Sequence, residues 1–477
     1  MQVKSMFFKQ SASMKLQDPV LQESLRKFKG KFVEARARAV AEVDAWEAVR
    51  AHAAQLRDRT IANLDAYLVE FERNATRRGA QVHWAETAEE ACAIVAEIAR
   101  ANNVKKVTKS KSMVSEEVNL NDKLEAAGIQ VIETDLGEYI LQLAHEPPSH
   151  IVAPAVHKSK EEVADLFHAA HHKPRLTDIA AMTREAREAL REHFLTADMG
   201  VSGSNFVIAE TGTTLTVTNE GNADLVTTVP RIHCVITGIE KVIPTLEDFA
   251  TLIRLLPRSA TGQAIANYLT LTTGVRAPGE TDGPEQMHIV LVDAGRSKFL
   301  GGEMQEMLRC IRCGACMNHC PVYQNVGGHA YGWVYPGPMG SVLTPTYVGI
   351  ENAGDLPNAA TFCGECAVVC PVKIPLPDLM RKLREKQFDM KLRPWSERAG
   401  ITLWSYAARR PKLYAALTKM AARVASWMGG REKLIHRLPG LDGWTSGRDM
   451  PAPEGKTFRE MYGESQRREA LSTDKHG

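Results

Sequence analysis

The chain has 477 residues, enough for about three domains that each bury a core. Its 59 Lys and Arg nearly balance its 57 Asp and Glu, and the net charge of +2 argues against whole-chain nucleic-acid binding. No apolar run approaches the roughly 18 residues of a membrane span, and no export signal is visible, so we expect no transmembrane segment.

Residues 18 to 73 have the apolar periodicity of helix. Asp18-Pro19 is a start signal, because an aspartate caps a helix well and a proline suits its first turn. Apolar residues then recur at helical spacing as far as Leu68. We therefore predict an N-terminal helical segment.

From Gly79 onward, short apolar runs alternate with helical segments. Residues 87–90 open one helix with a capping box, and residues 245–256 form another. Alternation of strand and helix predicts an α/β fold with a mostly parallel sheet and helices on both faces. The predicted strands are 82–84, 104–107, 129–132, 150–153, 206–209, 215–218, 232–237 and 288–292.

Two loops of this domain carry enough polar side chains for a ligand pocket. The loop after Val107 is suited to an anion beyond a strand end, although a solvated loop in which Ser112 caps the next helix explains it equally well. The second loop region, 200–222, is glycine-rich, and hairpin turns alone would explain much of it. The candidate pocket residues are Lys109, Ser110, Lys111, Ser112, Glu210, Thr211, Gly212, Thr213, Glu220 and Asn222.

Seven of the nine cysteines fall in two short runs, at 310–320 and 363–370. The first has the C-x2-C-x2-C-x3-C-P spacing of bacterial two-cluster ferredoxins, in which the fourth thiolate crosses to the other cluster. Structural zinc is the rival interpretation, but zinc has no use for a third and fourth cysteine in such a run. Cys92 and Cys234 lie in apolar contexts and are predicted to be buried.

The second run is an incomplete copy of the first. Residues 313–322 and 363–372 agree at six of ten positions, but Ala360 stands where the copy of Cys310 would be. By the crossover rule, the first cluster takes Cys310, Cys313, Cys316 and Cys370, and the second takes Cys320, Cys363 and Cys366. We predict two iron–sulfur clusters, the first [4Fe-4S] and the second [3Fe-4S], or [4Fe-4S] with a non-cysteine ligand. Candidates for that ligand are Glu365, Asp355, His319 and a group from solvent, substrate or a partner.

The C-terminal region is basic and rich in tryptophan. Residues 381–437 contain fifteen Lys or Arg against four Asp or Glu. A helix is predicted from Pro411, with an apolar stripe that includes Leu413, Met420 and Trp427. Three interpretations stay open: packing on the ferredoxin-like domain, docking of an acidic partner subunit, or peripheral attachment to an anionic membrane.

Residues 109–113 (KSKSM), 202–225 (SGSNFVIAETGTTLTVTNEGNADL) and 393–400 (RPWSERAG), with the incomplete cysteine pair, resemble the lactate utilization protein B family. These are LUD-family iron–sulfur proteins of bacterial L-lactate oxidation, and their seven-cysteine pattern agrees with Ala360. The resemblance implies electron transfer during oxidation of L-lactate to pyruvate, alongside two companion proteins. It also implies that the α/β domain is similar to CoA-transferase and sugar-isomerase folds.

The expected architecture is an N-terminal helical segment (1–75), an α/β domain (76–300), an α-helical two-cluster ferredoxin-like domain (301–390) and a helical C-terminal region (391–477). No strand precedes a dinucleotide-binding G-x-G-x-x-G. We therefore expect a cytoplasmic electron-transfer subunit that passes electrons to an acceptor, while a partner or an interface handles the 2-hydroxy acid. Two alternatives stay open. The α/β domain is itself catalytic through Glu210 or Glu220 on an acyl or phosphorylated substrate, or the chain is a redox sensor.

Overall fold

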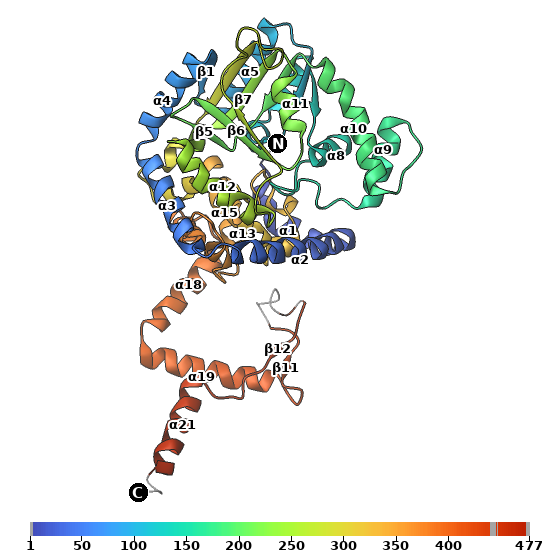
Figure 1. Ribbon diagram of the computed structural model, residues 1–477. Helices are drawn as coiled ribbons and strands as arrows, with labels where there is room; N and C mark the ends of the chain where they lie inside the picture. The colour runs from blue at the N-terminus through green and yellow to red at the C-terminus, as the bar shows by residue number, and fades with distance from the viewer. Residues whose placement is uncertain (1–2, 439–444, 446, 474–477) are drawn as a thin grey trace. The chain divides into compact units, whose positions relative to one another are not determined.

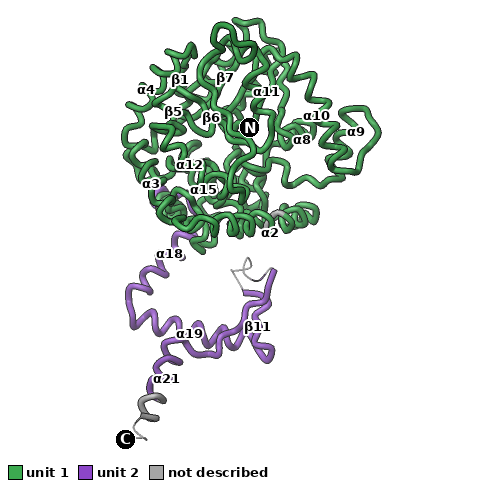
Figure 2. Tube along the Cα trace, viewed as in Figure 1, with its two compact units in different colours: residues 1–387 green, residues 388–477 purple. Residues whose placement is uncertain are grey.

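The computed structural model describes residues 3–438, 445 and 447–473. The chain forms two compact units, residues 1–387 and residues 388–477 (Figure 2). The predicted inner boundaries near residues 75 and 300 fall inside the first unit and stay predictions, as does the boundary at 390.

The N-terminal segment is helical, as predicted, but it is divided into separate helices. These are α1 (Phe8–Leu16), α2 (Pro19–Ala41), α3 (Trp46–Ala62) and α4 (Leu64–Arg77). The Asp18 side chain accepts a hydrogen bond from the Leu21 N–H at 3.1 Å, which caps the start of α2.

A six-stranded, wholly parallel sheet organises the first unit (Figure 1). Its strands in spatial order are β1 (Ala80–Ala85), β10 (Gln286–Val292), β7 (Ile232–Gly238), β4 (Met199–Ser202), β2 (Lys106–Lys109) and β3 (Gln130–Glu133). Alternate residues of β10 enter two different apolar clusters: Val290 packs with α5 (Ala88–Ala101), and Ile289 packs with α4. The sheet is therefore covered on both faces, as the sequence predicted.

A second, smaller sheet contains the strands around the glycine-rich region. Its order is β8 (Val242–Ile243), β5 (Phe206–Ile208), β6 (Thr213–Thr218) and β9 (Tyr268–Thr272). Only the β5–β8 pair is parallel. Strands β4, β8 and β9 were not predicted.

The predicted strand at 150–153 is wrong. The Nδ1 atom of His150 accepts hydrogen bonds from the N–H groups of Val152 and Ala153, each at 3.0 Å. Because these two N–H groups bond to a side chain and not to a neighbouring strand, the segment forms a turn.

The capping box predicted at residues 87–90 is half formed. The Thr87 hydroxyl accepts a hydrogen bond from the Glu90 N–H, but the Glu90 carboxylate accepts from the Glu86 N–H and not from the Thr87 N–H.

Short helices connect these strands and surround the cysteine segments. Those between the strands are α6 (Met113–Glu117), α7 (Leu120–Ala126), α8 (Leu136–Ala144), α9 (Lys160–His171), α10 (Ile179–Thr196), α11 (Asn222–Thr228) and α12 (Leu246–Ala260). Around the cysteines lie α13 (Ala315–Asn318), α14 (Tyr323–Val326), α15 (Gly337–Val348), α16 (Glu365–Val368) and α17 (Leu376–Asp389). One continuous apolar core joins α3, α12 and both cysteine segments, so five of the motif cysteines, Cys313, Cys316, Cys320, Cys366 and Cys370, belong to the interior of the first unit.

The second unit contains α18 (Trp395–Ala408), α19 (Pro411–Met428), the two-residue strands β11 (Leu434–Ile435) and β12 (Met450–Pro451), and α21 (Phe458–Thr473). Helix α19 begins at Pro411, as predicted. Its apolar stripe is exposed. Among the described residues, no helix is both long and apolar enough to cross a bilayer.

Candidate iron–sulfur centre and adjoining cavity

The two cysteine segments share the same backbone conformation at matching positions. The angle φ is 57° at both Arg312 and Phe362, and it is 77° at Gly314 and 85° at Gly364. A short helix follows each glycine, and these helices, α13 and α16, pack together. Because left-handed backbone is uncommon outside glycine, its recurrence at Arg312 and Phe362 shows that the sequence repeat is also a structural repeat.

The thiols of these segments fall into two neighbourhoods. Burial, followed by the charges of Cys370 and Cys310, raises the pKa of Cys313 to about 12. Burial, followed by the charges of Cys320 and Cys363, raises the pKa of Cys366 to about 12. The charges of Cys310, Cys313, Cys366 and Cys370 all act on Cys316, so the assignment of each thiol to one cluster stays a prediction.

The donor chemistry of the site fits iron–sulfur clusters. All nine cysteines of the chain are free of disulfides, and five of the seven motif cysteines lie in one apolar cluster, against which Cys310 packs. So many buried thiolates require positive charge beside them, because burial disfavours the charged form. Iron supplies that charge when a cluster is bound. Cys92 and Cys234 are buried elsewhere, as predicted.

The two neighbourhoods differ in exposure at one thiol. Cys320 and Cys366 are buried like most of the first neighbourhood, in which only Cys310 is half-buried, whereas Cys363 is exposed and Ala360 is half-buried. The second neighbourhood therefore reaches the protein surface.

The candidate ligands for the second cluster have different surroundings. The Asp355 carboxylate lies 3.2 Å from the Lys9 ammonium, so it is already paired. The His319 Nδ1 lies 2.9 Å from the carbonyl oxygen of Ala315. Glu365 is half-buried at the start of α16, and its charge acts on His319.

Arginines from the N-terminal helices hold the second cysteine segment. Arg50, on α3, donates from Nη2 to the carbonyl oxygens of Val368 and Cys370, each at 2.7 Å. Arg36, on α2, donates to the carbonyl oxygen of Val369 at 2.9 Å. These carbonyls terminate α16, where a cation is favourable. Sequence reasoning missed both arginines, although each lies among the apolar positions of a predicted helix.

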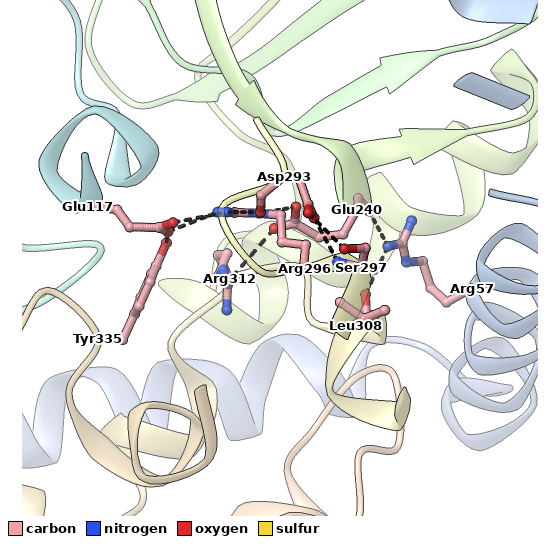
Figure 3. Close-up of polar contacts among 9 residues, drawn as sticks. All are labelled: Arg57, Glu117, Glu240, Asp293, Arg296, Ser297, Leu308, Arg312 and Tyr335. Atoms are coloured by element: carbon pink, nitrogen blue, oxygen red, sulfur yellow. Dashed lines mark hydrogen bonds and ion pairs between the residues drawn. The ribbon is translucent and has the colours of Figure 1, made fainter. Parts of the chain in front are cut away.

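A buried ionic network joins the first cysteine segment to the parallel sheet (Figure 3). Arg296 donates to both oxygens of Glu117 at 2.9 and 2.8 Å, and to Glu240 at 2.6 Å. Arg312 lies 3.4 Å from the other Glu240 oxygen, and the Tyr335 hydroxyl donates to Glu117 at 2.5 Å. Burial alone would raise the pKa of Glu240, but the nearby cations, with Arg296 foremost, lower it to about 2.

Arg57, on α3, extends this network to the N-terminal helices (Figure 3). It donates to the carbonyl oxygens of Glu240 and Leu308 at 2.5 and 2.9 Å. Leu308 precedes the first cysteine by two residues, so this one buried guanidinium connects α3, the end of β7 and the entry to the cysteine segment.

A cavity of about 500 Å³ lies where the carboxyl ends of the parallel strands meet the first cysteine segment. Its wall includes Asp135, Lys241, Arg312, Cys313 and Tyr335. Five of the predicted pocket residues also line it: Ser110, Lys111, Ser112, Glu220 and Asn222. The carboxyl edge of a parallel sheet is the usual place for a ligand in such folds. The Ser112 side chain also caps the start of α6, which is the role that the sequence offered as an alternative to ligand binding.

The other five predicted pocket residues lie outside this cavity. Lys109 is buried between Glu116 and Glu133, with an N–O distance of 2.8 Å to each. Glu210 accepts a hydrogen bond from the Leu246 N–H at the start of α12. Of the remaining three, Thr211 and Gly212 lie in the turn between β5 and β6, where Gly212 packs against α4, and Thr213 begins β6.

Glu220 is the cavity residue with the most altered acidity. It is largely buried, and its carboxylate accepts a hydrogen bond from the Leu136 N–H at 3.0 Å. Burial and the charge of Asp135 raise the pKa of Glu220 to about 7. Lys111, paired with Asp135 at 2.9 Å, partly offsets this rise. The cavity therefore contains an acid that exchanges its proton near neutral pH.

Three family models match consecutive parts of the chain. They are described as LUD domain (residues 68–292), 4Fe-4S dicluster domain (306–374) and Lactate utilisation protein B, C-terminal (381–467).

Curated relatives match along nearly the whole chain. A Lactate utilization protein B of Lysinibacillus sphaericus is 45% identical over 95% of each chain. That of Geobacillus thermodenitrificans is 45% identical over 89% of each chain, and an uncharacterized electron transport protein of Escherichia coli is 41% identical over 97% of each. A solved DUF162 family protein of Deinococcus radiodurans aligns with 48% of this chain and 98% of its own, at 14% identity and a TM-score of 0.28.

Proposed function

Since the chain belongs to the lactate utilization protein B family, we propose that it carries electrons during the oxidation of L-lactate to pyruvate, as an iron–sulfur subunit that acts with companion proteins. The observation that carries this proposal is the set of motif cysteines in and beside one apolar cluster, with Cys363 of the second cysteine segment at the surface. Because every cysteine is a free thiol, a reducing cytoplasm is the compartment that suits the protein.

The ligands assigned to the first cluster are Cys310, Cys313, Cys316 and Cys370, and those assigned to the second are Cys320, Cys363 and Cys366. When bound, each cluster takes up and releases one electron at a time. The exposure of Cys363 supports the second site as the contact with an external electron donor or acceptor. Arg36 and Arg50 orient the chain around Cys370, whose thiolate crosses from the second segment to the first cluster.

Electron paramagnetic resonance of anaerobically purified protein, combined with iron and sulfide analysis, tests this proposal. We expect two distinct iron–sulfur signals, of which one is of the [4Fe-4S] type. Zinc without sulfide, or a single cluster, would contradict it. The fourth ligand of the second cluster is tested by the same spectra, because a [3Fe-4S] centre has its own signal in the oxidised state.

A second candidate function, catalysis in the α/β domain, is favoured by Glu220, which lines the same cavity as Cys313. Glu220→Gln and Glu210→Gln provide a matched pair, since Glu210 lies outside the cavity. If the domain is catalytic, Glu220→Gln alone abolishes lactate oxidation by the assembled complex. If the chain only conducts electrons, both variants stay active, and the purified chain alone produces no pyruvate from lactate with a dye acceptor.

A further inference from the structure

The cavity beside Cys313 contains two buried cationic side chains whose charges are not fully paired. Lys241 is 6% exposed, and its ammonium makes no hydrogen bond or ion pair with any residue in the described ranges. The Arg312 side chain is 8% exposed, and its Nη1 atom is buried without a hydrogen-bond partner among those same residues. Unpaired buried cations are costly, so these two call for an anion in the cavity.

The nearest carboxylate does not meet this need. Glu240 is the acidic group beside Arg312, but one of its oxygens is already held by Arg296 at 2.6 Å. The other lies 3.4 Å from Nη2 of Arg312, a long contact that leaves the Nη1 atom without a partner among the described residues. The Arg312 guanidinium is instead held by the Tyr335 ring, because its central carbon lies 4.6 Å from the centroid of that ring. Arg312 is therefore positioned and has one nitrogen to which no described residue is hydrogen-bonded, and Lys241 lines the same cavity.

The rest of the wall offers neutral polar atoms. The Oδ1 of Asn222 and the Oγ of Ser110 are buried and have no hydrogen-bond partner within the described chain. Glu220 adds a carboxyl group that exchanges a proton near neutral pH. A ligand with one carboxylate and a neighbouring hydroxyl or carbonyl oxygen would satisfy both kinds of group.

We propose that this cavity binds a small 2-hydroxy or 2-oxo monocarboxylate, with the carboxylate held by Lys241 and Arg312 and the second oxygen by the polar wall. The choice of acid rests on the proposed function, in which L-lactate is converted to pyruvate. Because Cys313 lines the cavity, the bound acid lies in the same cavity as one of the cysteines assigned to the first cluster. The α/β domain thereby becomes a binding site for the reactant or product of the pathway that the clusters serve.

Calorimetry on the anaerobically purified full chain, with both clusters verified by resonance spectra, tests the proposal. The probes are L-lactate, pyruvate and L-lactamide, the last of which replaces the carboxylate by a neutral amide. We expect L-lactate or pyruvate to bind and to alter the signal of the first cluster, whereas L-lactamide binds at least about tenfold more weakly. Tighter binding of L-lactate would identify the cavity as a site for the reactant, and tighter binding of pyruvate as a site for the product.

Lys241→Met is the direct variant, and Lys158→Met is its control. Lys158 is also mostly buried, but it pairs with Glu146 at 2.5 Å in a different cavity. We expect Lys241→Met to weaken carboxylate binding at least about tenfold and Lys158→Met to leave it unchanged.

Equal binding of L-lactamide, or unchanged binding to Lys241→Met, would overturn the proposal. So would the absence of binding to a chain that holds both clusters, because Lys241 and Arg312 would then only balance cluster charge. That last result leaves the electron-carrying function intact. The comparison of the three probes needs no variant, so it stays decisive even if Lys241→Met does not fold.

Discussion

Replacing Arg296 by methionine should strongly destabilise the first unit. Arg296 is wholly buried and holds two carboxylates, Glu117 and Glu240, which are themselves 4% and 3% exposed. Removing one partner of a buried ion pair costs about 3–5 kcal/mol, because the other charge is left uncompensated. Arg312 remains 3.4 Å from Glu240 and offsets part of this cost, so we expect a loss of about 3 kcal/mol in the free energy of unfolding.

Urea unfolding followed by circular dichroism measures this loss, and iron content shows whether the first cysteine segment is disturbed. Arg175→Met is the matched control, because Arg175 pairs with Asp165 at 2.5 Å, but the two side chains are 37% and 66% exposed. We expect that control to unfold at nearly the same urea concentration as wild type, because water screens an exposed ion pair. A loss below about 1 kcal/mol for Arg296→Met would refute the reasoning that burial makes this network indispensable.

The same variant has a predictable pH dependence. The folded-state pKa of Glu240 is about 2, below its ordinary value of 4.5, so its contribution to stability is present above pH 4.5 and is lost as pH falls toward 2. Much of that contribution depends on Arg296. The difference in stability between wild type and Arg296→Met should therefore be largest near neutral pH and should narrow as the pH falls below 4.5. A constant difference would mean that lost packing, not charge, causes the effect.

Three further variants test separate features. The pKa of Glu220 is raised from 4.5 to about 7, so ionising this buried carboxyl lowers the free energy of unfolding as pH rises from 4.5 to 7. The Glu220→Gln variant cannot ionise, so its free energy of unfolding should match that of wild type near pH 4.5 and exceed it by at most about 3 kcal/mol at pH 8, as measured by thermal unfolding. Arg50→Met should cost about 2–3 kcal/mol and release iron, because it leaves buried carbonyls at α16 without their donor; full iron content would argue against this role. Ala360→Cys should give the second cluster a [4Fe-4S] signal with four thiolates, and an unchanged spectrum would show that position 360 does not face the cluster.

Local pattern was sufficient to predict much of the first unit. Strands β7 and β10 are buried along nearly their whole length and are mostly apolar, because parallel strands covered on both faces need apolar residues on both sides. The run at 150–153 has the same composition but forms a turn, since the His150 side chain takes the backbone donors. A hydrogen bond to a side chain leaves no trace in hydrophobic periodicity.

The candidate site was only partly predictable, for a related reason. Cysteine spacing is local, so the sequence alone was enough to propose the clusters. The cavity instead combines Lys111 with Lys241 and Arg312, which are far apart in the chain and meet only through the tertiary fold. Nothing near Lys241 or Arg296 in the sequence distinguishes them from solvent-exposed cations.

The hydrogen bonds from Arg50 to the Cys370 carbonyl oxygen also affect the order in which the protein folds during synthesis. These partners are separated by 320 residues, so α3 leaves the ribosome long before the carbonyls it binds exist. At about 5–20 residues per second, the interval is roughly 16–64 s. During that time the apolar surface of α3 that later contacts the cysteine segments has no partner, which makes the nascent chain dependent on chaperones or on early folding of the parallel sheet. Long-range closure of this kind also slows folding, so the last step in biogenesis should be the docking of the cysteine segments onto helices made at the start.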